Sequence, residues 1–326
     1  MSYTKSADVS NRSRVGHLDI DQRAPKSARW LNESLGVTSR KRKWVGVIWV
    51  LPALAAYVLF VLFPLGQTVR YSFYNWDGIG VATWAGFNNY VQVFTQPELI
   101  SSIVHSFILI VFFTIIPVFL GLIAASLLQR RRQGAFTTVT RTILFFPQIV
   151  PLAGAGIMWS WMYAPNGAVN GLLRAVGLGG LTQQWLGNFN TALPAVGIIG
   201  VWLSLGFCTV LFLSGISKVD PATYEAARID GAGAVREFFA ITLPALRGEI
   251  VVAVTVTVIA ALESFDVIYV STQGGPGYAT MVPGVEIYRL TFLNQHIGAA
   301  SALAVVLTIL VLIVVSIIQR VGRGRD

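Results

Sequence analysis

The segment EAARIDGAGAVREFFAITLP, residues 225–244, is a charged stretch that lies between two long apolar runs. It carries two arginines, two glutamates and one aspartate, and an Asp-Gly turn signal stands in its middle. A chain that returns directly into an apolar environment needs only a few polar residues to reverse its direction. We therefore expect this segment to have a folded structure of its own.

The local sequence predicts a helix-turn-helix hairpin. Asp220 and Pro221 suit the start of a helix, because Asp accepts hydrogen bonds from the first N–H groups and Pro fits the first helical position. Gly231 suits the left-handed conformation that closes a helix. A second helix is expected over residues 234–243 and is ended by Pro244. Such a hairpin has too small a core to be stable alone, so it is expected to pack on the rest of the chain, on a partner, or on both. A loop lying on a membrane surface is the alternative.

The composition requires a lipid bilayer as solvent. Of 326 residues, 54% are hydrophobic and only 12% charged, and the mean hydropathy is +0.65, whereas a soluble domain is about a quarter charged. The net charge of +9 does not favour nucleic-acid binding, because the basic residues gather beside the apolar runs. The single cysteine, Cys208, excludes an intrachain disulfide, and no metal site is predicted.

Six apolar segments, each of about 20 residues or more, are long enough to cross a hydrocarbon core of about 30 Å as helices. The sequence therefore predicts an all-α integral membrane protein with six transmembrane helices. The expected spans cover residues 44–69, 103–128, 142–163, 193–215, 250–270 and 297–318.

Lysine and arginine set the expected orientation. Of the 24 basic residues, 21 fall in the N-terminal tail, the loop 129–141, the loop 216–249 and the segment 319–326 after the last span. The positive-inside rule places these segments, both termini and the hairpin in the cytoplasm. The expected domains are a largely disordered cytoplasmic tail over residues 1–43, a transmembrane domain over residues 44–320 and a short tail over residues 321–326.

The hairpin resembles the EAA motif of permease subunits of bacterial ATP-binding-cassette (ABC) importers. The match consists of Glu225-Ala-Ala, then Gly231, then nine residues, then Ile241-Thr-Leu-Pro. Thr272-Gln-Gly-Gly-Pro and Phe265-Asp-Val-Ile-Tyr resemble the carbohydrate-importing subclass, as do YSFYNW at residues 71–76 and GFNNY at residues 86–90. The resemblance covers about residues 44–320, and the chain is similar to the maltose and glycerol-phosphate permeases.

The resemblance implies a transport subunit of the bacterial cytoplasmic (inner) membrane. Its implied partners are a second homologous permease, an ATPase dimer that binds ATP and Mg²⁺, and an extracytoplasmic solute-binding protein that delivers a sugar. The hairpin is then the coupling element that docks on the ATPase. No GxxxxGK[ST] phosphate loop occurs in the sequence, so this chain is expected to bind no cofactor and to be no enzyme. The expected ATPase-coupling residues are Glu225, Ala226, Ala227, Asp230, Gly231, Ala232, Leu243 and Pro244.

Polar groups within spans are candidates for a solute pathway. Thr257, Ala261 and Ser264 recur at i, i+4 and i+7, so they are expected on one face of the fifth helix, and Ser204 and Phe207 are one turn apart on the fourth. In the maltose-type relative the matching positions line the sugar site, which the resemblance implies here for Leu203, Ser204, Phe207, Thr257, Ala261 and Ser264. Trp202 is a further candidate because aromatic faces stack on sugar rings, with packing as the alternative. Whether this subunit or its partner makes most of the solute contacts stays open.

Three ionisable residues within spans are harder to assign. Glu263 and Asp266 are expected i, i+3 apart and away from the Ser264 face, with pairing or capping as the role of Asp266 and no role assigned to Glu263. His105 is expected to be a packed or interfacial histidine. A proton-coupled secondary transporter of a small polar solute is the main alternative function, although no internal repeat and no basic intramembrane partner is visible. An intramembrane enzyme is disfavoured because His17, His105 and His296 lie near no poised serine or cysteine.

The charged residues within the spans limit the class of solute that the chain can carry. A phosphate group would need an arginine or lysine near the middle of the membrane, and none of the six spans offers one there. Neutral sugars are therefore favoured, whereas the individual sugar or polyol and the role of the N-terminal tail are left open.

Overall fold

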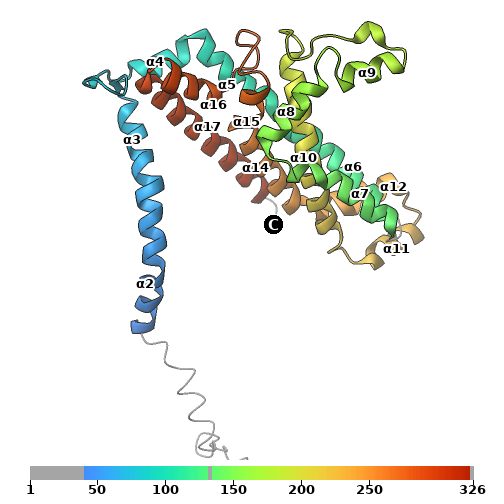
Figure 1. The fold of residues 1–326 in the computed structure, drawn as a ribbon. Coiled ribbons are helices and arrows are strands. Elements are labelled where there is room, and N and C mark those ends of the chain that lie inside the picture. The colour runs from blue at the N-terminus through green and yellow to red at the C-terminus, as the bar shows by residue number, and fades with distance from the viewer. Residues whose placement is uncertain (1–39, 131–133, 324–326) are drawn as a thin grey trace, which may run out of the picture. The chain divides into compact units, whose positions relative to one another are not determined.

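The computed structural model describes residues 40–130 and 134–323 (Figure 1). The chain divides into two compact units, residues 1–64 and residues 65–326. In the first unit, helix α2 (Arg40–Tyr57) continues through a π-helical turn, η2 (Val58–Leu62), toward α3 (Phe63–Tyr71). The predicted disorder of residues 1–39 lies outside the described residues. Residues 40–43, also assigned to that tail, are instead the first turn of α2.

Long helices build the second unit. The first of them consists of α5 (Pro97–Ile110), the π-helical turn η3 (Val111–Ile115) and α6 (Ile116–Arg130), which follow without a break. It packs against α10 (Ala192–Ile216), and α10 packs in turn against α14 (Arg247–Leu262). The last long helix, α17 (Ile297–Arg323), lies along α14 in Figure 1. Because α17 runs to Arg323, the first half of the predicted C-terminal tail is helical, and residues 324–326 lie outside the described residues.

Four helices in the described chain are long and apolar enough to cross a membrane: Trp49–Tyr71, Pro97–Gln129, Ala192–Ile216 and Ile297–Gly322. Two bent pairs raise that number to six if each pair is one span. The first pair, Thr137–Ile149 and Leu152–Met162, bends by 103°, and the second, Ala234–Ala245 and Arg247–Leu262, bends by 71°. Four of the six expected spans are therefore continuous helices. The first bend falls within the third expected span, whereas the second falls before the fifth, between the second arm of the hairpin and α14.

Prolines break the third expected span. Helix α7 (Ala135–Phe145) passes into a 3₁₀ turn, η4 (Phe146–Ile149), which contains Pro147. Pro151 then stands directly before α8 (Leu152–Met162) in an extended conformation, with ψ 138°. A proline has no N–H to donate and disfavours the helical region for its predecessor. Val150, before Pro151, is extended with ψ 126°, so the chain turns here.

The fifth expected span ends early. Helix α14 stops at Leu262, and α15 (Asp266–Ser271) starts a new helix after three non-helical residues. Phe265 stacks on Tyr269 with ring centroids 5.1 Å apart and also contacts Tyr288 at 5.8 Å. This aromatic packing holds the interruption in place. A single helix over residues 250–270 was therefore a wrong expectation.

Short elements connect the spans. Between α3 and α5 lie a two-residue strand pair, β1 (Tyr74–Asn75) antiparallel to β2 (Thr83–Trp84), and helix α4 (Asn88–Thr95). After α8 come α9 (Ala168–Ala175) and η5 (Gly179–Leu181), and before α17 come α16 (Pro283–Tyr288) and the π-helical turn η7 (Arg289–Leu293). The fold of the described chain is thus helical apart from one minimal strand pair.

Glycines let the helices of the core approach closely. A Cβ atom at Gly206 of α10 would overlap the carbonyl oxygen of Leu144, and one at Gly200 would overlap the ring of Phe113. The fully buried Ile199 and Phe212 lie on the same helix. Small residues at helix crossings are typical of membrane bundles, where packing drives association.

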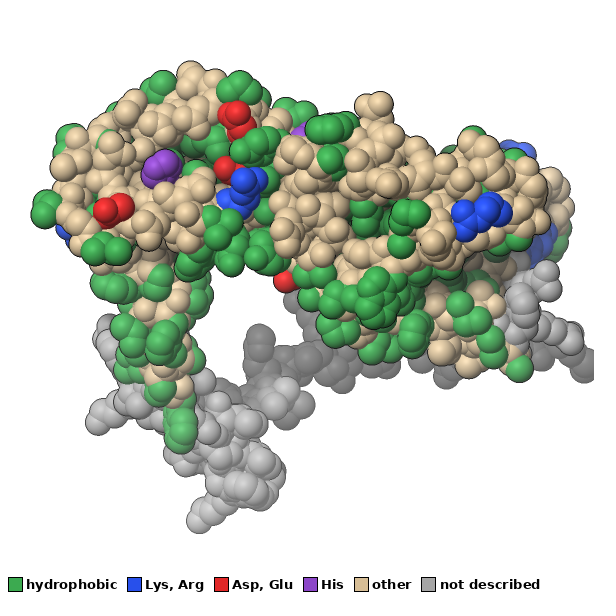
Figure 2. Space-filling view, turned by 45° about the horizontal axis from the view of Figure 1, so that its top comes forward, with side chains coloured by type: hydrophobic (Ala, Val, Ile, Leu, Met, Phe, Trp, Pro, Cys, Tyr) green, Lys and Arg blue, Asp and Glu red, His purple; other side chains and the backbone are tan. Residues whose placement is uncertain are grey.

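The outer surface of the bundle is apolar. On α17, Ile309, Leu312, Ile313 and Ile317 have between 49% and 61% of their surface exposed. On the face drawn in Figure 2, hydrophobic side chains form broad patches and charged side chains are few. A surface of this kind is stable in contact with lipid tails, not with water.

Candidate functional site

The first arm of the charged hairpin is helix α11 (Pro221–Ile229). The Asp220 side chain caps it by accepting a hydrogen bond from the Ala222 N–H at 2.9 Å. At the other end Gly231 has φ +80°. Its N–H donates to the Arg228 carbonyl at 3.0 Å, and the N–H of residue 232 donates to the carbonyl of residue 227 at 2.8 Å. This pair of bonds is a Schellman closure, so the predicted start, turn and glycine of the first arm are confirmed.

The second arm is less regular than expected. It consists of α12 (Ala234–Glu237), a π-helical turn, η6 (Phe238–Thr242), and α13 (Leu243–Ala245). Pro244 therefore does not end the arm, which stops one residue later and bends into α14 at Leu246. The widened π turn directly before Pro244 accommodates a ring that would clash with the preceding turn of a regular α-helix.

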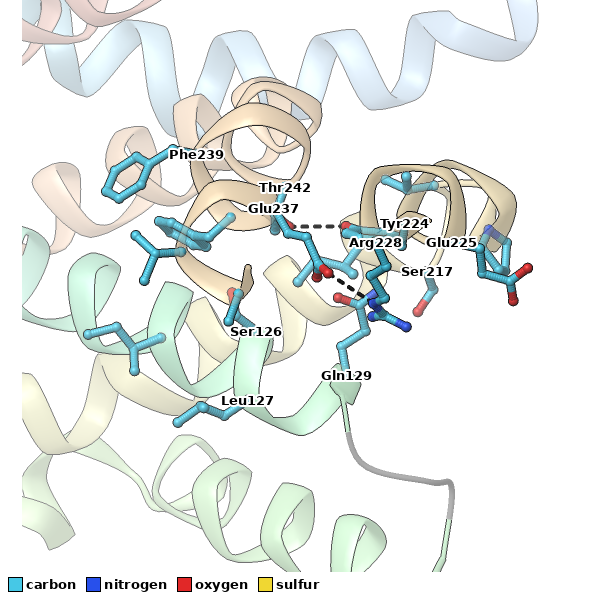
Figure 3. Close-up of a pocket in the computed structure, with 17 residues that line it drawn as sticks. Ser126, Leu127, Gln129, Ser217, Tyr224, Glu225, Arg228, Glu237, Phe239 and Thr242 are labelled. Atoms are coloured by element: carbon cyan, nitrogen blue, oxygen red, sulfur yellow. Dashed lines mark hydrogen bonds and ion pairs between the residues drawn. The ribbon is translucent and has the colours of Figure 1, made fainter. Parts of the chain in front are cut away.

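Two side-chain contacts, Tyr224–Thr242 and Arg228–Glu237, form a clasp that holds the two arms together (Figure 3). The hydroxyls of Tyr224 and Thr242, both buried, lie 3.1 Å apart. The Arg228 guanidinium donates from Nε to Oε1 of Glu237 at 2.9 Å, and the Glu237 side chain is only 3% exposed. This hydrogen bond and the charge of Glu237 raise the pKa of Arg228. The hairpin is therefore fixed by its own side chains.

A cavity of about 560 Å³ lies where the hairpin meets the ends of α6 and α10. Figure 3 shows Ser126, Leu127 and Gln129 of α6 on one side of it and the clasp on the other. Glu225 contributes to the wall, but in Figure 3 its carboxylate projects outward, away from the Arg228–Glu237 pair.

The hairpin is anchored to the bundle at its base. Leu246 is fully buried, and a Cβ atom at Gly215 of α10 would come within 2.5 Å of Leu246 Cδ2. Lys218 Nζ and Glu249 Oε1 form an ion pair at 2.8 Å between the end of α10 and the first turn of α14. The base of the hairpin is therefore joined to both α10 and α14.

The tip of the hairpin is exposed and partly apolar. Of the eight predicted coupling residues, Glu225, Ala226, Asp230, Gly231 and Pro244 are exposed and Ala227, Ala232 and Leu243 are half-buried. The sequence interpretation missed Ile229, which is 86% exposed, and Val235, which is 71% exposed. Large aliphatic side chains on an otherwise charged hairpin were the available signal. An exposed apolar tip on a self-clasped element is the form of a docking surface.

The predicted pathway residues divide by burial. Leu203, Thr257 and Ala261 are buried within this chain, whereas Trp202, Ser204, Phe207 and Ser264 are half-buried. The ring of Trp202 packs edge-to-face on Trp159 at 5.8 Å. The Thr257 hydroxyl donates to the Ala253 carbonyl at 2.8 Å, so its polar group is satisfied within its own helix.

The predicted common face of residues 257, 261 and 264 needs correction. Because α14 ends at Leu262, Ser264 lies beyond the helix, where its hydroxyl donates to the Ala261 carbonyl at 2.9 Å. Glu263 and Asp266 are both exposed and lie at the ends of two different helices, so they do not share one helix as expected. No side-chain capping bond forms at the start of α15, although an acidic residue in its first turn suits the helix dipole.

His105 is packed, as expected. Its Nδ1 donates to the Met281 carbonyl at 2.9 Å, which ties α5 to the segment before α16. Within the described residues, no group of three or more His, Cys, Asp and Glu side chains is arranged to hold a metal ion.

Comparison with protein families matches residues 117–323 to the family described as "Binding-protein-dependent transport system inner membrane component". The chain belongs to this family. The permease is 34% identical over 283 residues to the diacetylchitobiose uptake system permease protein NgcF of Streptomyces coelicolor, covering 83% of this chain and 80% of the relative. It is 32% identical over 310 residues to the sulfoquinovosyl glycerol transport system permease protein SmoG of Agrobacterium fabrum, covering 94% and 97%.

The fold of the permease also matches a solved structure. A crystal structure of a bacterial ABC transporter involved in the import of the acidic polysaccharide alginate aligns with a TM-score of 0.75 at 22% identity, covering 88% of this chain and 97% of that chain. The permease is therefore a multi-pass inner membrane component of a transport system. Its family consists of ABC transporter permease subunits, which are not enzymes.

Proposed function

We propose that this permease forms half of the translocation pathway of an ABC importer for a sugar. The observation that carries the proposal is the self-clasped hairpin, whose exposed tip is joined through Leu246 and the Lys218–Glu249 pair to two helices of the bundle. The two named relatives are permeases of an uptake system for diacetylchitobiose and of a transport system for sulfoquinovosyl glycerol. These names support a carbohydrate as the solute.

The proposed topology has six spans, of which the third is bent and the fifth is interrupted after Leu262, with both termini and the hairpin in the cytoplasm of a bacterium. The bias of 21 basic residues against three supports this orientation. The proposed partners are a second homologous permease, an ATPase dimer that binds ATP and Mg²⁺, and an external solute-binding protein. A related alginate transporter was crystallised in complex with its periplasmic protein, which supports the last of these.

In the proposed mechanism the ATPase binds the tip of the hairpin. Ile229 and Val235 supply apolar contact, and the outward carboxylate of Glu225 supplies a negative charge. Movement of the ATPase subunits then shifts the hairpin as one body, because the clasp resists deformation. The shift reaches α10, which carries Ser204 and Phe207 of the proposed pathway, and α14, which carries Thr257. This is a two-state element biased by nucleotide.

The decisive experiment measures sugar uptake by the complex reconstituted with its ATPase and binding protein. Gly231→Pro should leave the permease in the membrane but abolish ATP-dependent uptake, because proline cannot adopt φ +80° and removes the N–H that closes the first arm. Gly233→Ala is the matched control, since Gly233 has φ −76° and open space around it. Normal uptake by Gly231→Pro would refute the coupling role. Uptake by this chain alone in ATP-free vesicles with a pH gradient would instead identify a secondary transporter.

A further inference from the structure

A second hollow lies on another side of the hairpin. It is a groove of about 850 Å³ between α14, α17 and the second arm. Its walls are mostly aliphatic and include Val251 and Val254 of α14 and Ile317 and Ile318 of α17. The two helices come together at Gly322, where a Cβ atom would lie 2.5 Å from Val251 Cγ2. The groove is therefore closed by a helix crossing and lined for an apolar occupant.

Two arginines border this apolar groove. Arg247 is the first residue of α14, and Arg320 lies in the last turns of α17. Both are exposed, and within the described residues neither has an ion pair or a side-chain hydrogen bond. The acid nearest to Arg247 in sequence, Glu249, is already paired with Lys218. Two positive charges thus stand beside an apolar surface with no counter-charge among the described residues.

We propose that an anionic phospholipid occupies this groove. Its phosphate lies between Arg247 and Arg320, and an acyl chain runs along the aliphatic walls past Val254. Guanidinium groups bind phosphate oxygens through two parallel hydrogen bonds, and the N-terminus of α14 adds a favourable dipole. Both arginines lie at the ends of candidate spans, where long basic side chains reach the head-group region.

The position of Arg320 on α17 favours a lipid over a protein segment as the occupant. Ile309, Ile313 and Ile317 precede it by about three, two and one helical turns, and all three are among the exposed side chains of this helix. The arginine therefore stands at the end of an exposed aliphatic stripe. Acyl chains that cover such a stripe continue directly into the groove, with their head groups at the level of the arginine.

The lipid would also contact the hairpin. Phe239, Leu243 and Pro244 of the second arm form one wall of the groove. A bound lipid therefore bridges this arm to α14 and α17 and stiffens the joint between hairpin and bundle. The consequence for transport, an anionic-lipid requirement for coupled uptake, rests on the proposed function, whereas the lipid site itself does not.

The test measures lipid retention by the full-length permease, purified in mild detergent with its attached subunits. Native mass spectrometry after incubation with phosphatidylglycerol or phosphatidylcholine gives the preference for the anionic lipid. Arg247→Gln and Arg320→Gln should each lower phosphatidylglycerol retention about fivefold, the value of one basic residue at a membrane surface. The double Lys variant keeps both charges and should retain most of the preference. Arg236→Gln, which removes an exposed charge of the hairpin outside the groove, is the matched control and should leave retention unchanged.

A steric variant tests the groove independently of charge. Val254→Phe should lower phosphatidylglycerol retention with both arginines present. If the arginine variants do not assemble, this variant alone tests whether a lipid occupies the groove.

Equal retention by the wild-type and the double Gln protein would overturn the proposal. So would cross-linking of position 320 to another subunit in a complex whose lipid content is unaffected. Uptake assays in phosphatidylcholine vesicles with graded phosphatidylglycerol separate the two proposals, because a failure of ATP-driven uptake in all vesicles would count against the importer function and leave the retention result standing.

Discussion

Arg228 and Glu237 join the two arms of the hairpin through a hydrogen bond of 2.9 Å between Nε and Oε1. The arginine side chain is 55% exposed, whereas the glutamate side chain is 3% exposed. A carboxylate taken out of water is stable only when it is paired and hydrogen-bonded. The closed form of the hairpin therefore depends on a contact within this chain, before any partner binds.

Arg228→Gln should loosen the hairpin. The substitution removes the charge that faces a buried carboxylate, so the charge-assisted hydrogen bond between the two arms is lost. Hydrogen exchange of the purified permease should show lower protection over residues 221–245 and unchanged protection in α5. Arg236→Gln on the second arm is the control, since Arg236 is exposed and lies outside the clasp. Equal protection in the two variants would show that the clasp does not depend on Arg228.

Gly206→Ala should destabilise the whole bundle. A Cβ atom at this position meets the carbonyl oxygen of Leu144, and backbone cannot move aside as a side-chain tip can. Overpacking of this kind costs about 1–3 kcal/mol, which should appear as a lower thermal midpoint in detergent. Gly154→Ala in α8 is the matched helical control, because its nearest neighbours would be 3.9 Å and 4.0 Å away. A similar midpoint for both variants would contradict the close crossing of α10 and α7.

The parts of the site that could be predicted are those set by single residues. Asp220 caps a helix and Gly231 closes one because their own chemistry selects those conformations, wherever the chain packs. Pro147 and Pro151 likewise mark a break because neither residue can donate a backbone hydrogen bond. For these features the local sequence was sufficient.

The parts that could not be predicted depend on packing. No proline or glycine marks the end of α14 at Leu262, and the interruption is held by the contacts of Phe265 with Tyr269 and Tyr288, which come from separate helices. The Arg228–Glu237 pair spans nine residues and two helices, so charge patterning alone could not select it among the five charges of the hairpin. The exposure of Ile229 and Val235 also follows from the fold and not from composition.

Glu286 should make stability depend on pH. It is 5% exposed, and its Oε2 has no hydrogen-bond partner in the part of the chain that the structure describes. Burial raises the pKa of Glu286, Arg289 lowers it in part, and Glu98 raises it further. Since folding raises this pKa, the neutral Glu286 carboxyl is favoured in the folded state. Its contribution to the free energy of unfolding is complete below the ordinary pKa of 4.5 and is lost as the pH rises through the pKa of the folded state.

Glu286→Gln should therefore flatten this pH dependence. The thermal midpoint of the wild-type protein is expected to fall from acidic toward alkaline pH more steeply than that of the variant. Glu98→Gln should reduce the slope in part, because it removes a charge that raises the pKa of Glu286. Parallel curves for wild type and Glu286→Gln would show that the carboxyl group is not the source of the slope.

Ser204 and Thr257 should differ in their effect on transport, although both were predicted to line the pathway. The Thr257 hydroxyl donates to the Ala253 carbonyl and is buried, whereas Ser204 is half-buried and its hydroxyl has no partner among the described residues. Ser204→Ala should lower the rate of sugar uptake about 2- to 10-fold, the value of one hydrogen bond, and Thr257→Val should change it little. Uptake by the reconstituted complex at saturating binding protein, normalised to the amount of permease, measures both. A bulky Ser204→Trp should reduce uptake further or alter the selectivity among sugars. If Thr257→Val proves the more damaging change, the solute must reach the α14 face, and this chain must open further during transport than its present packing allows.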